Sequence, residues 1–512
     1  MPIECHLNNI SYLHPLKTAI MSVLFVYSLQ KSVLRKKPLK GQEDMQFGIS
    51  YISAVLKENG YKTSLAVLDR RYGKRNYKTL GQKIQAFKPG IICFTSVNTE
   101  FHFICDIAKY VRQQFPGVFL LIGGVHVTLN PEEALLNTFD ALCIGAGEYP
   151  VTELAGRLDR QEDYSDIPNL WVKQAGNVKK NPPRPFIEDL DALPFAERDI
   201  WQEWILEPNT RLTMLLGRGC PFNCTYCCNH RLRKTAPGKY VRLRSPENIT
   251  REIEALMKLF PSRGEIFLEV ESFGIDMQWM EALCQLLGAV HKATGVRFST
   301  NLRIYPGMDA EQIFALLHTA GFDSVIIGLE SGSERIRKEI LNRNYTNADI
   351  IKAVKAAKRN GIKVGIFNMA GIPGETYRDF EETLHMNREI QPAWHATSVF
   401  FPYKGTELYE MAARDRLLPR KLNFKDERQK AVLNLPCFSA KQIQKAFDDF
   451  HFQVYKKAEK KNLFKYTLYF LQRFLGHNFM ANAKLFFIRV LYKMRLQNIS
   501  RRLKLFSIMQ KS

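Results

Sequence analysis

The sequence lacks the features of membrane-spanning, secreted and disulfide-bonded proteins. No apolar run reaches the ~18 residues of a membrane-spanning helix, and the first twenty residues show neither a long apolar core nor a cleavage site. Ten cysteines in 512 residues are too few for a disulfide scaffold. We therefore expect a cytoplasmic protein, and a content of 46% hydrophobic residues excludes a mainly disordered chain.

The usual nucleotide-binding motifs are also missing, as are internal repeats and low-complexity stretches. Neither GxGxxG nor GxxxxGKS or GxxxxGKT occurs in the sequence. An ordinary site for a dinucleotide or a nucleoside triphosphate therefore has no motif to support it. The length is enough for about three domains.

Acidic residues are nearly absent from the last part of the chain. From His451 to Ser512 there are fourteen Lys and Arg residues and one acid, Glu459, so more than half of the net charge of +22 lies there. Apolar and basic residues alternate at helical spacing in 468–475 and 484–496. Three interpretations stay open for this region. They are a helical cap on the protein, a membrane-surface helix and, least favoured for want of a motif, nucleic-acid binding.

Strand-like and helix-like segments alternate in the first third of the chain. Short β-branched runs predict strands at 22–28, 91–96, 118–124 and 140–148, with helices at 48–60 and 101–117. This alternation predicts a Rossmann-like parallel sheet with helices on both faces. Several glycines follow the strand ends, where such sheets admit ligands, although tight turns alone would also explain them.

The segment RGCPFNCTYCC at residues 218–228 carries the strongest motif. Cys220, Cys224 and Cys227 fit C-x3-C-x2-C, and Tyr226 stands directly before the third cysteine. Three thiolates on one short loop can hold three irons of a cubane [4Fe–4S] cluster and leave the fourth iron open. A structural zinc site would need four closed ligands, and no second cysteine pair follows. The spacing therefore predicts an iron–sulfur cluster.

The cysteine motif and the segments after it resemble the radical S-adenosylmethionine (SAM) enzymes. The resemblance implies a partial (β/α)6 TIM-type barrel over residues 211–410, in which function gathers at the carboxyl ends of the strands. A helix is expected to follow Ser245, which is a plausible N-cap before proline. Strands are predicted at 213–217, 265–273, 296–304, 324–333, 363–376 and 398–408.

Polar residues at the expected strand ends are assigned to SAM by this resemblance. Glu271 stands where family members carry an acid for the SAM amino group, and GIPGET at 371–376 resembles a motif near the adenine. Glu269 shares the face of Glu271 and is also explained as a partner for a Lys or Arg. Ser299, Asn301 and Arg303 alternate along the strand at 296–304. They therefore share one face of it, which points either into the barrel interior or toward the helices. The SAM contacts that the resemblance implies are Glu271, Ser299, Asn301, Arg303, Glu330 and Ser331.

The first third of the chain resembles the cobalamin-binding domain of B12-dependent radical SAM enzymes. The likeness lies in QFGISYISAVLKENGY, FKPGIICFTS, LLIGGVHVTLNPEEAL and DALCIGAGE, in this order. The D-x-H-x-x-G motif that supplies a lower axial histidine in methionine-synthase-type domains is missing, which implies cobalamin bound base-off without a protein histidine. His126 lies near the expected pocket, but a turn histidine that bonds local backbone is the simpler interpretation. The cobalamin contacts that the resemblance implies are Ser96, Gly123, Gly124, His126, Gly145 and Gly147.

A Pro-rich segment at 166–199 joins the two predicted domains. It predicts an ordered linker with a small hairpin. The fold class is therefore α/β, with a Rossmann-like cobalamin domain, a partial SAM barrel and a helical C-terminal region. The expected boundaries are 1–21 for an N-terminal extension, 22–160 for the cobalamin domain, 161–210 for the linker, 211–410 for the radical SAM core and 411–512 for the basic helical region.

Together the resemblances imply a cobalamin-dependent radical SAM methyltransferase that acts on an unactivated carbon. Its cofactors would be a [4Fe–4S] cluster, SAM and cobalamin. A cyclase or rearrangement enzyme with the same cofactors stays open. An RNA-modifying methylthiotransferase is less favoured, because it would carry three further N-terminal cysteines and a small C-terminal β domain. A non-catalytic cobalamin sensor would leave the cysteine triplet without a purpose.

The expected partners follow from the same interpretation. A lipid or secondary metabolite is the expected small-molecule substrate, and flavodoxin or ferredoxin is the expected external reductant. The basic C-terminus predicts peripheral contact with the inner face of the membrane. Nucleic acid is not expected as a partner.

Overall fold

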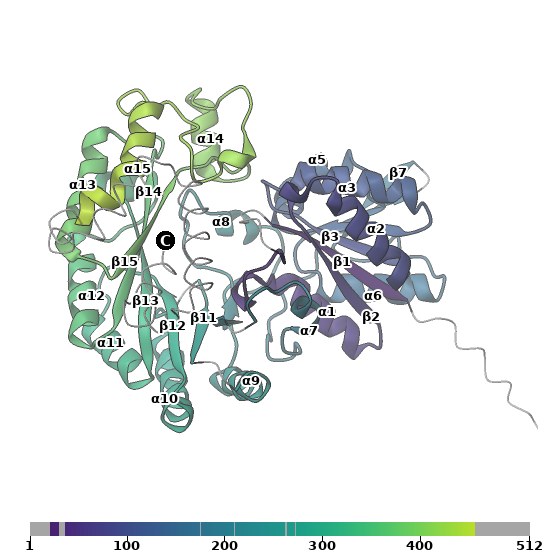
Figure 1. Cartoon of the computed structure of the whole chain (residues 1–512), viewed down its shortest axis with the longest axis horizontal. Coiled ribbons are helices and arrows are strands. Elements are labelled where there is room, and N and C mark those ends of the chain that lie inside the picture. The colour runs from purple at the N-terminus through teal and green to yellow at the C-terminus, as the bar shows by residue number, and fades with distance from the viewer. Residues whose placement is uncertain are drawn as a thin grey trace, which may run out of the picture.

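The computed structural model describes residues 21–29, 36–174, 176–208, 210–261, 264–271 and 273–455. The predicted N-terminal extension, apart from residue 21, and the predicted helices at 468–475 and 484–496 lie outside the described residues. Two α/β units stand side by side, the N-terminal one in purple and blue and the barrel in teal and green (Figure 1). No helix in the described part of the chain is long and apolar enough to cross a membrane.

The N-terminal unit is built on a seven-stranded sheet in the order β2-β1-β3-β4-β5-β6-β7. The first five strands are parallel, as predicted, and β6 and β7 form an antiparallel hairpin on β5. The expected hairpin of the linker therefore extends the first sheet beyond residue 160. The strands are β1 (Ser22–Ser28), β2 (Lys62–Leu68), β3 (Ile91–Thr95), β4 (Phe119–Gly123), β5 (Ala141–Cys143), β6 (Leu170–Gln174) and β7 (Asn177–Lys180).

Both faces of this sheet are buried under helices. Helices α1 and α6 cover one face and α2 and α3 the other, so neighbouring residues of β1 such as Phe25 and Val26 enter different cores. Burial on both faces explains the continuous apolar runs of the strands. Helix α2 was not predicted, because it is mostly polar and packs through Leu80 and Ile84. The helices are α1 (Phe47–Glu58), α2 (Arg75–Phe87), α3 (Phe101–Gln114), α4 (Val125–Leu129), α5 (Pro131–Leu135) and α6 (Glu148–Asp159), with short 3-10 turns η1 (Gln42–Asp44) and η2 (Arg70–Tyr72).

The second unit is an open barrel of six parallel strands in the order β15-β14-β13-β12-β11-β8. Its outer strands β8 and β15 do not pair, so the partial barrel predicted from the sequence is confirmed. Ser245 caps the helix after it, since its side chain accepts a hydrogen bond from the Asn248 amide at 3.1 Å. The strands are β8 (Leu212–Leu215), β11 (Glu265–Glu269), β12 (Arg297–Leu302), β13 (Phe322–Glu330), β14 (Lys363–Ala370) and β15 (Trp394–Val399).

Helices cover the outer face of the barrel strands and enclose its main apolar core. A separate two-stranded ribbon, β9 with β10, precedes the first of them. These elements are β9 (Gly217–Arg218), α8 (Asn229–Leu232), β10 (Arg242–Leu243), α9 (Pro246–Leu259), α10 (Met277–Thr294), α11 (Ala310–Thr319), the π-turn η3 (Ile336–Ile340), α12 (Asn347–Arg359) and α13 (Tyr377–Ile390).

The predicted sixth strand of the barrel is present, but its predicted position at 398–408 is wrong. The strand β15 ends at Val399, and the segment then turns through Pro402 and Gly405, which has a φ of +92°. Proline removes a backbone donor and this φ favours glycine, so the chain cannot stay in a ladder there. The helix α14 (Glu407–Arg414) begins where the strand was expected, and it is followed by η4 (Phe424–Asp426) and α15 (Ala440–Tyr455). The described C-terminal helices pack on β14, β15 and α13.

The linker and helix α1 cover the inner face of β8. Leu215 of this strand packs against a small apolar cluster that includes Tyr51 of α1 and Leu193 of the linker. Trp201, in the short helix α7 (Asp199–Gln202), is fully buried in the core of the N-terminal unit. The two units are therefore joined by packing as well as by the chain.

Candidate functional site

The three cysteines of the motif lie on one loop at the mouth of the barrel, between β9 and α8. Gly219 precedes the loop with a φ of +88°, and a Cβ there would lie 2.2 Å from the carbonyl oxygen of Tyr240. Only glycine fits this position. Cys224 is buried, Cys220 and Cys227 are half-buried, and all three are free thiols.

Hydrogen-bond partners surround the thiols. Arg303 Nη1 lies 3.0 Å from Cys224 Sγ, and Asn229 Nδ2 lies 3.6 Å from Cys227 Sγ. The side chain of Cys228 lowers the pKa of Cys227 to about 6, with a further contribution from Asn229. Burial raises the pKa of Cys220 to about 11. Donors to a sulfur stabilise its thiolate, the form that binds metal.

The arrangement fits a cluster better than a single metal ion. No group of three or more Cys, His, Asp or Glu side chains among the described residues converges closely enough to hold one ion. In a cubane each thiolate binds a different iron, so its ligands lie farther apart than those of one zinc ion. Cys220, Cys224 and Cys227 would hold the cluster here.

The aromatic residue of the motif is fixed from the far side of the barrel mouth. The Tyr226 hydroxyl donates to Glu330 Oε1 at 3.1 Å, and Arg343 Nη1 donates to both of these groups, at 2.5 Å and 2.9 Å. Glu330 has a φ of +61°, a strained value for a residue with a side chain. Its Oε2 has no hydrogen-bond partner among the described residues, which leaves one carboxylate oxygen for a ligand.

The predicted SAM residues divide into two groups. Glu271 and Arg303 lie at the cluster loop with Glu330, since Glu271 Oε1 accepts from Asn229 at 3.2 Å. Ser299 lies deeper, where its hydroxyl donates to Glu265 at 2.9 Å near the amino end of β11. Ser331 is fully buried beside α13, with its hydroxyl 3.4 Å from that of Thr383.

The remaining predicted SAM residue, on β12, has a different position. Asn301 lies on the inner face of the strand, one residue pair below Arg303, and makes no side-chain hydrogen bond within the described chain. The alternating residues of this strand therefore face the barrel interior and not the helices. The assignment of all six residues to SAM stays a prediction.

The predicted cobalamin residues lie together at the carboxyl edge of the first sheet, after β3, β4 and β5. Gly124 has a φ of +100°, and a Cβ there would lie 2.6 Å from the Ser96 carbonyl oxygen, so β3 and β4 loops approach closely. The Ser96 hydroxyl is buried without a hydrogen-bond partner among the described residues. Gly145 and Gly147 follow β5 in the same edge. Such an edge is where parallel sheets bind ligands.

His126 is not held as a simple turn histidine. Its ring stacks on Phe101 of α3, with centroids 4.2 Å apart, and its Nδ1 lies 3.4 Å from the Asn98 amide. Burial lowers its pKa to about 4, so the ring is neutral near pH 7. Its Nε2 has no hydrogen bond among the described residues and lies 4.0 Å from a Glu133 carboxylate oxygen. The neutral ring with one open nitrogen fits a polar ligand at this edge.

Two ion pairs cross the boundary between the N-terminal unit and the barrel. Arg218, two residues before Cys220, lies 2.7 Å from Glu148, which directly follows Gly147. Lys404, after β15, lies 2.7 Å from Glu133 of α5. Helix α8 contacts α4 and is drawn between the two units in Figure 1. The roles of Arg218, Arg343 and Asn229 at this site were not predicted from the sequence. Their partners are remote in the chain or lie on loops without a motif.

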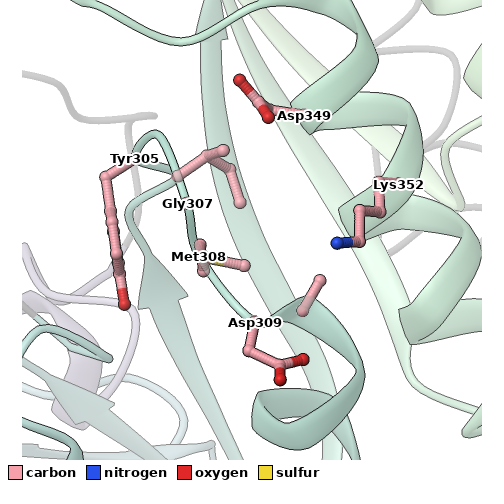
Figure 2. A pocket seen from close by; sticks show the side chains of 8 residues that line it. Tyr305, Gly307, Met308, Asp309, Asp349 and Lys352 are labelled. Atoms are coloured by element: carbon pink, nitrogen blue, oxygen red, sulfur yellow. The ribbon is translucent and has the colours of Figure 1, made fainter.

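A separate pocket of about 250 Å³ lies outside this site, between the loop before α11 and the start of α12. Asp309, Asp349 and Lys352 surround it in Figure 2. Both carboxylates cap helices: Asp309 accepts from the Gln312 amide, and Asp349 forms a capping box with Thr346. These aspartates are explained by helix capping.

The first sheet carries loops at its carboxyl edge, where parallel sheets bind ligands, and the open barrel carries a three-cysteine loop. Together these features define a protein that holds an iron–sulfur cluster next to a second cofactor. The chain is a radical SAM enzyme with a B12 domain. Residues 214–386 match the radical SAM superfamily and residues 42–155 match the B12 binding domain. The predicted [4Fe–4S] cluster, SAM and cobalamin are the cofactors of these two families.

Similar proteins include enzymes of more than one reaction type. The chain is 24% identical over 461 residues to an uncharacterized methyltransferase of Pyrococcus horikoshii, covering 89% of this chain and 97% of the relative. It is 24% identical over 371 residues to the anaerobic magnesium-protoporphyrin IX monomethyl ester cyclase of Rubrivivax gelatinosus, covering 71% and 65%. The fold resembles the cobalamin-dependent S-adenosylmethionine radical enzyme OxsB with aqua-cobalamin bound, with a TM-score of 0.66, 16% identity, and 89% and 72% coverage.

Proposed function

We propose that this protein is a cobalamin-dependent radical SAM methyltransferase that methylates an unactivated carbon of a small molecule. The observation that carries the proposal is the ion pair of the half-buried Arg218 with the buried Glu148, which joins the cysteine loop to the glycine edge of the B12 domain. A methyltransferase needs its hydrogen-abstracting and methyl-carrying cofactors on either side of one substrate carbon. The relation to a methyltransferase over nearly the whole length of the Pyrococcus protein supports this reaction.

The residues of the chain have distinct roles in this proposal. Cys220, Cys224 and Cys227 would hold the cluster, and Glu271 and Glu330 would contact SAM beside it. When bound, the cofactors would supply the radical chemistry and the methyl group. The protein orients these groups and excludes water between them. An external reductant such as flavodoxin or ferredoxin is needed to supply electrons.

A cyclase or rearrangement enzyme is the second candidate, and the Rubrivivax cyclase supports it over 71% of this chain. An RNA-modifying methylthiotransferase is less well supported. Cys93, Cys105 and Cys143 are buried in β3, α3 and β5, so the described part of the first domain offers no second cysteine loop for another cluster.

The test is anaerobic turnover of the reconstituted protein with SAM, cobalamin, a reductant and candidate lipids or secondary metabolites. S-adenosylhomocysteine and 5′-deoxyadenosine are quantified separately. Formation of both products, each dependent on cobalamin, is the expected result. Deoxyadenosine without S-adenosylhomocysteine would overturn methyl transfer and favour the cyclase or rearrangement reaction.

A further inference from the structure

The segment after α14 returns to the barrel mouth and brings a carboxylate and an arginine there. The backbone amide of Val399, the last residue of β15, donates to the carbonyl oxygen of Arg428 at 3.0 Å. Glu427, the residue before this arginine, is buried. TIM-type barrels gather their functional groups at the carboxyl ends of the strands. Glu427 and Arg428 therefore lie at the functional end of the barrel, although they follow its last strand in the sequence.

The same segment contacts the B12 domain. Phe424, at the start of η4, meets the ring of His102 in the first turn of α3, with centroids 5.9 Å apart. Burial raises the pKa of Glu100, which directly precedes α3, to about 7, and the charge of Glu427 adds to this shift. Glu100 and His102 follow β3, at the carboxyl edge of the first sheet. The segment 424–428 therefore connects the barrel mouth to the edge predicted to bind cobalamin.

Tyr403 holds the guanidinium of Arg428 from one side only. Arg428 Nε donates to the Tyr403 hydroxyl at 2.8 Å, and that hydroxyl donates to Glu427 Oε1. The same Glu427 oxygen lies 3.7 Å from Arg428 Nε. The terminal nitrogens Nη1 and Nη2 make no hydrogen bond within the described chain, and the arginine side chain is 54% exposed. A planar fork of donors is therefore fixed in place and left open.

The predicted SAM site lies within electrostatic reach of this fork. Partial desolvation alone would lower the pKa of Arg428. The neighbouring Tyr403, Glu427 and Glu330 raise it instead. Glu330 is a predicted SAM contact and accepts a hydrogen bond from Tyr226 of the cysteine loop. Arg428 therefore has the SAM site on one side and, through its neighbour Glu427, the cobalamin edge on the other.

The backbone of Arg428 is strained. Its φ is +58°, in the left-handed region that residues with a side chain rarely adopt. Glycine would adopt this φ without strain. Strained residues cluster at functional sites, where the surrounding structure holds them in place. An arginine at this position is therefore explained if its guanidinium binds a ligand.

We propose that the open fork of Arg428 binds a carboxylate of the substrate. A guanidinium donates two parallel hydrogen bonds to the two oxygens of such a group. The nearby charges of Glu427 and Glu330 favour a singly charged carboxylate over a doubly charged phosphate. This inference rests on the proposed function, in which the substrate lies between SAM and cobalamin. It narrows the substrate from any small molecule to a carboxylic acid.

The test compares benzoate, benzamide and phenyl phosphate by ligand-observed NMR titration of the anaerobic holoprotein. SAM is present in excess, so that its own carboxylate site is filled. Benzoate should bind the wild-type protein about tenfold more tightly than benzamide, which lacks the charge that strengthens the paired hydrogen bonds. At about pH 8 phenyl phosphate is doubly charged and should also bind less tightly than benzoate.

Three variants assign the preference to the fork. Arg428→Gln should remove it by weakening benzoate about tenfold. Arg428→Gly should remove it while the Tm stays close to that of the wild type, because glycine adopts the backbone conformation without strain. Lys430→Gln removes the same charge from an exposed residue two positions away, and it should leave the preference unchanged.

The outcomes separate this inference from the proposed function. Cobalamin binding, SAM binding and 5′-deoxyadenosine formation are measured on the same samples. Equal affinity for benzoate and benzamide in the wild type, or an unchanged preference in Arg428→Gln, would overturn the carboxylate anchor. Weaker cobalamin or SAM binding in Arg428→Gln would also overturn it, because the fork would then belong to a cofactor. Tighter binding of phenyl phosphate than of benzoate would overturn the choice of a carboxylate. A benzoate preference in a protein that never forms S-adenosylhomocysteine would support the anchor while methyl transfer fails.

Discussion

The Arg218 guanidinium lies 2.7 Å from the Glu148 carboxylate, and both side chains are largely shielded from solvent. The guanidinium also lies over the ring of Tyr51, 4.9 Å from its centroid. Arg218 leads into the cysteine loop, and Glu148 starts the helix after the glycine edge of the B12 domain. The two cofactor loops are therefore held to each other by one buried ion pair rather than by the linker alone.

Replacing Arg218 by Met should destabilise the protein and weaken cobalamin binding. The change leaves Glu148 buried without a counter-charge, which typically costs about 3–5 kcal/mol. Thermal unfolding and equilibrium dialysis with cobalamin would measure the two effects. We expect a lower Tm and a raised Kd together, because the same contact fixes the edge that binds the cofactor.

Two controls distinguish this pair from an ordinary surface contact. Arg218→Met combined with Glu148→Leu removes both charges and should recover much of the lost stability. Lys404→Met breaks the second cross-domain pair, whose lysine is 48% exposed, and should cost less than about 1 kcal/mol. Equal losses of stability in Lys404→Met and Arg218→Met would show that burial of the Arg218–Glu148 pair does not cause the destabilisation.

Single replacement of Cys220, Cys224 or Cys227 by Ala should prevent assembly of a stable cluster. Each sulfur would hold a separate iron, so loss of one cannot be covered by the other two. Iron content and the visible absorbance of the anaerobically reconstituted protein measure this, with cobalamin binding as the test of folding. Cys437→Ala changes an exposed cysteine outside the loop and should keep full absorbance. A full cluster in any of the three loop variants would refute the ligand assignment.

Replacing Arg303 by Met should lower the reduction potential of the cluster. Arg303 donates to Cys224 Sγ at 3.0 Å, and a donor at a ligand sulfur stabilises the more negative, reduced state. A shift on the order of tens of millivolts is expected in an EPR-monitored titration without SAM. Arg297→Met, at the exposed start of the same strand, should not move the potential. An unchanged potential with weakened SAM binding would instead assign Arg303 to the SAM carboxylate.

Local signals in the sequence predict the two sheets and the cysteine loop well. Short β-branched runs located β1, β3, β4 and most barrel strands. The runs in the first sheet are continuous because helices bury both of its faces. Glycines after the strand ends marked the edge where Gly124 contacts Ser96. These features depend on neighbouring residues, so a local pattern carries them.

Other features depend on contacts between remote segments, which no local pattern contains. Arg343 is thirteen residues from Glu330 and meets Tyr226 across the barrel mouth. Trp394 lies outside the predicted strand at 398–408, although it begins β15. Its contact with the inner face of β14 at Gly365 follows from the register of the two strands.

The contribution of Glu375 to the stability of the protein should fall as pH rises from about 4.5 to about 8. Burial raises the pKa of this carboxyl from 4.5 to about 8, so the folded state holds a proton that the unfolded state releases within this range. One such group changes the free energy of unfolding by up to about 1.4 kcal/mol per pH unit. Glu375→Gln should flatten this slope in urea unfolding at pH 5, 6.5 and 8, since an amide keeps an acceptor for the Gly371 and Ile372 amides. Glu381→Gln, on the exposed face of α13, should keep the wild-type slope, and the same slope in Glu375→Gln would show that another group titrates.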